Sequence, residues 1–369
     1  MSPSPQYQTR RSAGRRFPGW LSAVLVLAAL LVAAPQAAVA DPWPRPAKPG
    51  CAARTAEVGL TGHRDARQYR IRGWLCQPRQ PTGTVQLLVP GLTYAHTYWT
   101  GPEGPDSGYV RTALTTGTAV FVFDRVGTGG SGTPPAEQVT LDAEATVIHQ
   151  LVSALRDGEL GRFTRVVGVG HSYGSMILQA ETAAFQDLDQ LVLTGLLHEL
   201  NWTTEAAFAA NLHPAGADPA YAHAGLPDGY LTTQPGTRAE YFLNPATAIP
   251  GAAAWDERTK ATATSGELAL DLGRQAADSR QIRVPVLLVV GADDVIFCGP
   301  GLACATANDL CARERGFYPA DTVLDAAVIA GTGHSIALHR TAEAAAAAIT
   351  SWITGHPYAA TPAITRCTS

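Results

Sequence analysis

Lysine is nearly absent from this sequence, which has only Lys48 and Lys260 among 369 residues. The chain also lacks a basic tract, a coiled-coil heptad run and a paired C-x-x-C motif. Its formal net charge is −4 and becomes −8 without residues 1–40, which carry four arginines and no acidic residue. An acidic chain of this kind offers no electrostatic attraction for the phosphates of a nucleic acid. Neither the cysteine nor the histidine spacing completes a zinc site, so we expect no metal.

Residues 1–40 have the pattern of a signal peptide. The four arginines form a positive region, an apolar stretch runs over residues 20–34, and a small-residue cleavage site ends at Ala40. A permanent membrane anchor is the alternative, but the apolar run is short for a bilayer and Pro35 ends it. We therefore expect a secreted protein, cleaved after Ala40, with no stable membrane anchor afterwards.

The cysteine count fits an oxidising compartment, because an even number in an exported chain suggests disulfides. We expect Cys51 to pair with Cys76 across an N-terminal hairpin, and Cys298 to pair with Cys304 or Cys311. On one helix, Cys304 and Cys311 would lie about 10 Å apart, too far to bond each other. The sixth cysteine is Cys367. Because paired thiols are not nucleophiles, a cysteine hydrolase is disfavoured.

Apolar strands alternate with helices along most of the chain, which predicts a mostly parallel sheet covered by helices on both faces. Two antiparallel strands are expected first, over 57–62 and 68–76, joined at 63–65. Helices are expected over 141–160 and 334–353. Buried strands are expected over 84–90, 118–123, 165–170, 190–196, 284–291 and 322–330.

This alternation breaks after residue 197. The following segment is polar, rich in proline, alanine and aromatic residues, and has no strong strand pattern. We predict that residues 198–279 form a largely helical cap over the carboxyl edge of the sheet. The core would then comprise residues 41–197 and 280–369.

The segment Gly-His-Ser-Tyr-Gly, centred on Ser172, joins an apolar strand directly to a helix. G-x-S-x-G in this setting is typical of a nucleophile elbow. So sharp a turn presses together the residues on either side of the serine, and only Gly170 and Gly174 fit there. The turn exposes the Ser172 hydroxyl and leaves the Tyr173 N–H at a helix N-terminus, facing developing negative charge. A glycine-lined turn without function is the alternative.

A serine nucleophile needs a base, and the base needs an orienting acid. Gly-Ala-Asp293-Asp294 follows one later apolar strand, and Gly-Thr-Gly-His334 follows the last. The order Ser, Asp, His, each at the end of a strand, is that of α/β-hydrolases. Asp294 is the favoured acid, with Asp293 and then Glu199 as alternatives.

With these motifs the sequence resembles the α/β-hydrolase superfamily, specifically its esterase- and lipase-like members, over about residues 84–353. The segment Phe-Asp-Arg-Val-Gly-Thr-Gly-Gly-Ser at 123–131 is a further match. The resemblance implies an α/β-hydrolase fold and a hydrolytic serine enzyme without a cofactor. Carried over to this chain, Ser172 is the nucleophile, His334 the general base and Asp294 the acid.

The resemblance also implies an oxyanion hole formed by the backbone N–H groups of Leu92 and Tyr173. The family usually has His-Gly before the first of these donors, and this chain has Pro90-Gly91. Pro90 in place of histidine changes the hydrogen bonds that support this loop, but the backbone N–H of Leu92 is still available as a donor. Three aromatic residues that follow, Tyr94, Tyr98 and Trp99, either line a substrate pocket or pack in the core.

One further pattern competes with this interpretation, and two further histidines could contribute to the site. The segment 127–132 satisfies G-x-G-x-x-G, the dinucleotide fingerprint, but Thr-Pro-Pro follows where that motif requires a helix. Among the other histidines, His96 and His198 are the two that could reach the cleft.

We therefore predict a secreted serine hydrolase that cleaves carboxylic esters through an acyl-enzyme. Lactone or amide hydrolysis and cofactor-free perhydrolysis are alternatives on the same triad, and a binding protein that has lost catalysis is a third. Scant basic charge and many aromatic residues in the cap predict a neutral, moderately apolar small-molecule substrate. These aromatic residues are Trp202, Tyr221, Tyr230, Tyr241, Phe242 and Trp255.

Overall fold

The computed structural model describes residues 50–62, 67–79, 82–101, 108–269, 271–356 and 362–368. The predicted signal peptide lies outside these ranges, as does the predicted link between the first two strands at 63–65. None of the helices within the described ranges combines the length and the apolar character that crossing a membrane requires.

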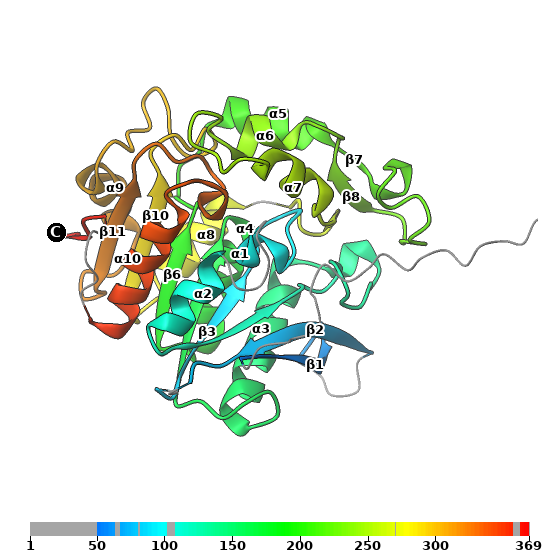
Figure 1. Cartoon of the computed structure of the whole chain (residues 1–369), viewed down its shortest axis with the longest axis horizontal. Helices are drawn as coiled ribbons and strands as arrows, with labels where there is room; N and C mark the ends of the chain where they lie inside the picture. The colour runs from blue at the N-terminus through cyan, green and yellow to red at the C-terminus, as the bar shows by residue number, and fades with distance from the viewer. Residues whose placement is uncertain are drawn as a thin grey trace, which may run out of the picture. The chain divides into compact units, whose positions relative to one another are not determined.

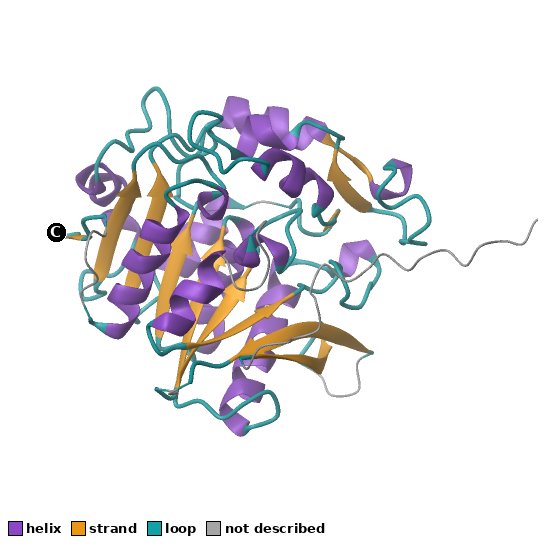
Figure 2. Ribbon diagram, viewed as in Figure 1, coloured by secondary structure: helices purple, strands orange, loops and turns teal. Residues whose placement is uncertain are grey.

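A nine-stranded sheet, in the order β1-β2-β4-β3-β5-β6-β10-β11-β12, organises the described residues (Figures 1 and 2). The strands from β4 to β11 in this order are mutually parallel. Antiparallel strands flank them, with β2 and β1 at one edge and β12 at the other. The bounds are β1 Cys51–Gly59, β2 Gln68–Cys76, β3 Thr84–Val89, β4 Ala119–Phe123, β5 Arg165–His171, β6 Gln190–Thr194, β10 Val286–Gly291, β11 Leu324–Ile329 and β12 Thr365–Arg366.

Helices cover both faces of this sheet (Figure 2). On one face α2 (Gly108–Thr115) packs against α10 (Ala342–Thr354), and on the other α4 (Tyr173–Phe185) packs between α3 (Leu141–Asp157) and α8 (Leu272–Ser279). Every residue of β3, β4 and β10 is buried. Strands covered on both faces bury every side chain, which explains the continuous apolar sequences of β4 and β10 and the mainly apolar sequence of β3. The mainly parallel sheet flanked by helices confirms the fold class predicted from the sequence.

The chain between β6 and β10 holds α5 (Trp202–Asn211), α6 (Arg238–Phe242), α7 (Ala252–Arg258) and the helix α8 described above. It also holds a separate three-stranded antiparallel sheet of β7 (Leu212–Pro214), β8 (Tyr230–Thr233) and β9 (Ala263–Thr264). The sequence predicted no strand there. The longest of these strands has four residues, too few for a period-two pattern to be recognised. The core and cap boundaries remain a prediction.

Three disulfides join all the cysteines: Cys51–Cys76, Cys298–Cys304 and Cys311–Cys367. Both predicted pairings are confirmed. In the first, the two cysteines lie opposite each other in the β1–β2 register.

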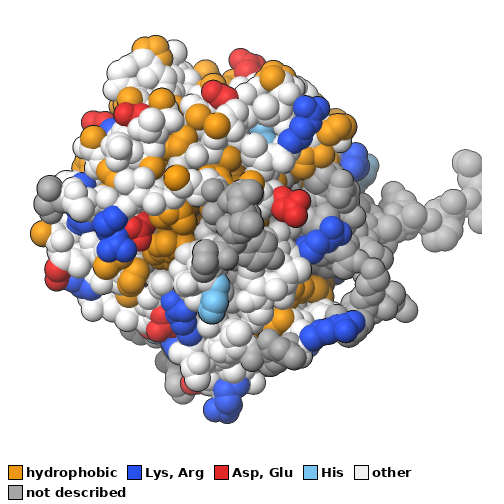
Figure 3. All heavy atoms as spheres, turned by 60° about the vertical axis from the view of Figure 1, so that its left-hand side comes forward, with side chains coloured by type: hydrophobic (Ala, Val, Ile, Leu, Met, Phe, Trp, Pro, Cys, Tyr) orange, Lys and Arg blue, Asp and Glu red, His pale blue; other side chains and the backbone are white. Residues whose placement is uncertain are grey.

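On the face of the molecule that Figure 3 shows, the charged side chains are scattered, with both signs interspersed.

Candidate active site

Ser172 lies on the turn between β5 and α4, with φ 52° and ψ −122°. A positive φ is uncommon for a residue with a side chain and marks local strain. The flanking glycines are explained by close packing. A Cβ on Gly170 would lie 2.5 Å from Ser175 Cα, and one on Gly174 would lie 2.3 Å from the Val89 oxygen. The local geometry is that of the predicted elbow.

His334 follows β11, and its Nδ1 is hydrogen-bonded to Oδ2 of Asp294 at 2.8 Å. Both side chains are at most 1% exposed. The other oxygen of Asp294 accepts hydrogen bonds from the N–H groups of Ile296 (2.9 Å) and Phe297 (3.3 Å). Asp293 instead accepts a hydrogen bond from the Asn244 amide at 2.7 Å. Of the two adjacent aspartates, Asp294 is therefore the partner of His334.

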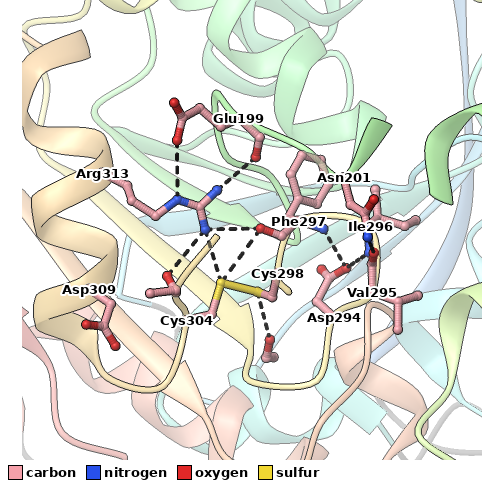
Figure 4. Close-up of a disulfide and its surroundings, with 12 residues drawn as sticks. Glu199, Asn201, Asp294, Val295, Ile296, Phe297, Cys298, Cys304, Asp309 and Arg313 are labelled. Carbon is pink, nitrogen blue, oxygen red and sulfur yellow. Dashed lines mark hydrogen bonds and ion pairs between the residues drawn. A yellow bond between two sulfur atoms is a disulfide. The ribbon is translucent and has the colours of Figure 1, made fainter. Parts of the chain in front are cut away.

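A disulfide and an arginine hold the loop that carries Asp294 in place (Figure 4). The Cys298–Cys304 disulfide closes it, and Arg313 on α9 (Ala307–Glu314) reaches across it. Arg313 donates hydrogen bonds to the Phe297 oxygen at 3.0 Å and to the Glu199 oxygen at 2.9 Å. The Glu199 carboxylate is 58% exposed and, within the described ranges, forms an ion pair with this arginine at 3.7 Å and none with His334.

Ser172 and His334 line the same cavity, which holds about 620 Å³ of empty space including the part open to solvent. No hydrogen bond joins the Ser172 hydroxyl to His334 within the described ranges. The walls are mainly apolar. They include Met176, Leu196, Leu197, Leu200, Phe208, Phe242, Leu272, Ile296 and Phe297. Clefts with mainly apolar walls and a few polar groups are typical binding sites for small organic molecules.

Both predicted oxyanion donors, Leu92 and Tyr173, belong to residues that line this cavity. Neither backbone N–H has an acceptor among the hydrogen bonds of the described chain. The two segments are close, since a Cβ on Gly91 would lie 3.1 Å from Ser172 Cβ. The next residue, Thr93, has φ 58°, and its hydroxyl accepts a hydrogen bond from the buried Arg238 at 2.8 Å.

The three aromatic residues that follow the loop divide between the cavity and the core. Tyr94 lines the cavity, and its hydroxyl is hydrogen-bonded to Ser335 at 2.6 Å. Tyr98 stacks on the His171 ring at 4.2 Å, and Trp99 packs edge-on against Tyr109. These contacts favour core packing for Tyr98 and Trp99, the alternative that the sequence left open. Of the cap aromatics predicted near substrate, Phe242 lines the cavity.

The two additional histidines do not reach the cavity, which corrects that expectation. His96 is hydrogen-bonded to Asp124 at 2.6 Å, and His198 to Glu314 at 2.6 Å. Each ring is buried against its carboxylate instead of facing the cleft. The glycine-rich segment folds around Asp124, which accepts the Gly130 N–H at 2.9 Å. A short 3-10 turn at 136–138 follows, and no helix opens there to bind a dinucleotide.

Three other side chains, His149, Glu181 and Asp187, place potential metal-ligand atoms within 4.8 Å of one another. His149 is already hydrogen-bonded to Asp187 at 2.6 Å. None of the three lines the cavity described above.

The sequence interpretation did not identify Glu205 or Phe208, which face the cavity from α5. Burial raises the pKa of Glu205 above its usual value, and the nearby His334 offsets part of that rise. Ile296 and Phe297 were missed as well. Their position two and three residues after Asp294 was the one available signal.

The model of the alpha/beta hydrolase family matches residues 86–348. The chain belongs to this family. Three solved structures share its fold at low identity. Carboxylesterase CesB of Bacillus subtilis is 12% identical with a TM-score of 0.55, over 85% of this chain and 94% of its own. A putative non-heme bromoperoxidase, BpoC, from Mycobacterium tuberculosis is 19% identical with a TM-score of 0.53, over 78% and 97%.

The third is a monoacylglycerol lipase of Paleococcus ferrophilus, 15% identical with a TM-score of 0.50, over 83% of this chain and 100% of its own. No protein of curated function matches the sequence. Family membership makes the chain a hydrolase by class. The type of bond that it hydrolyses has to be argued from its own site.

Proposed function

We propose that this protein hydrolyses carboxylic esters through an acyl-enzyme, with Ser172 as nucleophile, His334 as base and Asp294 as orienting acid. The observation that carries the proposal is the buried Asp294–His334 hydrogen bond beside a cavity that Ser172 also lines. A bond of this kind fixes the imidazole and stabilises the imidazolium that forms when the serine loses its proton.

The first step attaches the serine oxygen to the ester carbonyl carbon, while His334 takes the serine proton. The N–H groups of Leu92 and Tyr173, which have no other acceptor among the described residues, would receive the oxyanion. His334 then protonates the departing alcohol. In the second half of the reaction, water attacks the acyl carbon while His334 takes a proton from it, and His334 returns that proton to Ser172 as the acid leaves. Proton transfer requires the hydroxyl to come within hydrogen-bond reach of His334, a contact that often tightens only when substrate binds.

A fluorophosphonate probe and a series of p-nitrophenyl esters of increasing chain length test the proposal. We expect the probe to label Ser172 and Ser172→Ala to abolish both labelling and hydrolysis. Asp294→Asn should lower kcat by about 10³- to 10⁴-fold, because the amide holds the wrong imidazole tautomer. Asp293→Asn is the matched control, since that carboxylate contacts Asn244. Absence of labelling on folded protein would instead favour a binding protein.

We also propose that the protein is secreted after removal of residues 1–40. Three disulfides within the described residues support this, because such bonds persist in oxidising compartments. N-terminal sequencing of the mature protein should begin at Asp41, and an intact N-terminus on exported protein would contradict cleavage.

A further inference from the structure

The polar groups that line the cavity are unusual in kind. Its ionisable lining residues are two tyrosines, His334 and Glu205, and no lysine or arginine is present among them. The carboxylate of Glu205 has no hydrogen-bond or ion-pair partner within the described ranges. A carboxylate next to apolar walls is costly unless a donor or a positive charge meets it. A ligand that brings a donor or a positive charge would supply this partner; within the protein, His334 lies near Glu205 but forms no ion pair with it among the described residues.

Glu205 is held toward the cavity by its helix. It lies in the first turn of α5, whose N-cap is Asn201, and a negative charge is favoured at that end of a helix. Phe208 lies three residues further along, on the same face of α5, and lines the cavity too. The Phe208 ring lies 5.5 Å from the ring of Phe242. A cation beside Glu205 would thus lie on the same side of α5 as an aromatic ring, and aromatic rings attract positive charge over their faces.

A second acceptor without a donor belongs to the same lining. Gln275 is 1% exposed, and its carbonyl oxygen has no hydrogen-bond partner among the described residues. Its nitrogen donates to the Gln179 oxygen at 3.2 Å and to the Leu197 backbone oxygen at 3.5 Å. Gln179 in turn donates to the hydroxyls of Ser279 and Tyr318. The Gln275 oxygen itself is enclosed by protein atoms, so the acceptor that this part of the lining offers to a ligand is the carboxylate of Glu205.

We propose that Glu205 binds a substrate ammonium group, so that the preferred esters of this enzyme combine an apolar body with a primary amine. An ammonium offers three donors and a positive charge, which match the carboxylate of Glu205. This inference rests on the ester hydrolysis proposed above and revises the neutral substrate expected from the composition of the cap. The aromatic and leucine walls would hold the apolar body.

Matched pairs of methyl esters test the inference. Leucine methyl ester is compared with methyl 4-methylpentanoate, and methyl 6-aminohexanoate with methyl hexanoate, so that each pair differs only in the ammonium group. We expect kcat/KM to be at least about tenfold higher for one or both amino esters, the value of a charge-assisted hydrogen bond. Glu205→Gln should remove that advantage, so that each amino ester and its neutral partner differ in kcat/KM by no more than about twofold in this variant. Glu240 is an exposed acid on α6 outside the cavity, so Glu240→Gln should change kcat/KM neither for the amino esters nor for the neutral esters.

Binding is measured as well, so that failure of the inference is separable from failure of the proposed function. Hexylammonium should bind the wild-type protein and Ser172→Ala in calorimetry, and Glu205→Gln should weaken this binding by about tenfold. No hydrolysis of any ester, with binding that depends on Glu205, would overturn the ester function alone. Equal losses for amino and neutral esters in Glu205→Gln would overturn the inference, because Glu205 would then act through His334.

Discussion

At the scale of single residues, the strain at Ser172 is balanced by hydrogen bonds to one strand residue, Thr194 on β6. The Thr194 hydroxyl donates to the Gly170 oxygen at 2.8 Å, and its carbonyl oxygen accepts the Ser172 N–H at 2.8 Å and the Ser175 hydroxyl at 3.1 Å. A strained backbone persists only where its surroundings hold it. Thr194 therefore keeps the nucleophile turn in place from the neighbouring strand.

The lack of space at Gly170 gives a direct stability prediction. Gly170→Ala would place a Cβ 2.5 Å from the backbone of Ser175, so the turn must open. We expect the free energy of unfolding to fall by about 2 to 3 kcal/mol, as for other overpacked sites. Urea unfolding measures this. Gly216→Ala is the matched control, since a Cβ there meets nothing within 4 Å. Equal stability of the two variants would show that the elbow tolerates a side chain.

Residue identity was easier to predict than residue orientation. Ser172 and its glycines follow from steric limits that the sequence displays directly. The choice between Asp293 and Asp294 does not, because adjacent residues of one loop differ only in the direction of their side chains. Glu205 is harder still, since its place in the cavity depends on how α5 lies over the sheet.

At the scale of elements, the loop between β10 and α9 links the acid to the start of α5. Its Ile296 oxygen accepts the N–H of Asn201, the N-cap of α5, at 2.7 Å. Arg313 holds the same loop through the Phe297 oxygen (Figure 4). One short segment thus carries Asp294, part of the cavity wall and the attachment of the helix that bears Glu205.

Of the two disulfides in this part of the chain, we expect one to matter mainly for activity and the other mainly for stability. Cys298 and Cys304 are 6 residues apart, whereas Cys311 and Cys367 are 56 apart. By chain entropy the longer loop contributes about 2 kcal/mol more to stability. We expect replacing Cys298 and Cys304 by Ala to lower kcat about tenfold, because a loosened loop misplaces Asp294. Replacing Cys311 and Cys367 by Ala should lower stability more and leave kcat within about twofold.

Ester hydrolysis at saturation and urea unfolding of both double variants measure these effects. A loss of kcat that simply followed the loss of stability in both would contradict a specific role for the loop.

Element boundaries were predictable where the local pattern decides them. The parallel strands begin and end within about two residues of their predicted limits, whereas β1 begins at Cys51, six residues before the predicted start at 57. The last helix was expected from residue 334, but α10 begins at Ala342. Tertiary contacts hold the intervening residues: the Ser335 N–H donates to the Phe242 oxygen at 2.9 Å, and the Asn244 N–H donates to the His339 ring at 2.9 Å. Such contacts override a local preference for helix.

At the scale of the whole described chain, a buried arginine joins three distant segments. Arg125, on the loop after β4, is paired with Glu144 of α3 and, at 2.5 Å, with Glu267 beyond β9. It also donates to the Gly91 oxygen at 3.3 Å, next to Leu92. Two carboxylates thus share one guanidinium. Burial raises the pKa of Glu144; Arg125 opposes this rise, and the charge of Glu267 adds to it.

This raised pKa predicts how stability depends on pH. Because the folded protein holds the Glu144 proton more tightly than the unfolded chain, its contribution is complete below the unfolded value of about 4.3. The contribution is lost as pH rises through the folded pKa. Glu144→Gln cannot ionise, so we expect near wild-type stability at pH 5 and at least about 1 kcal/mol more than wild type at pH 9.

Urea unfolding at both pH values measures this, with the exposed Glu137→Gln as a control of unchanged slope. A variant that is destabilised equally at both pH values would mean that Glu144 stays ionised. Its removal would then leave the positive charge of Arg125 with one partner fewer, a loss that costs several kcal/mol at any pH. The pH profile therefore decides whether this buried cluster holds a proton or a full ion triad.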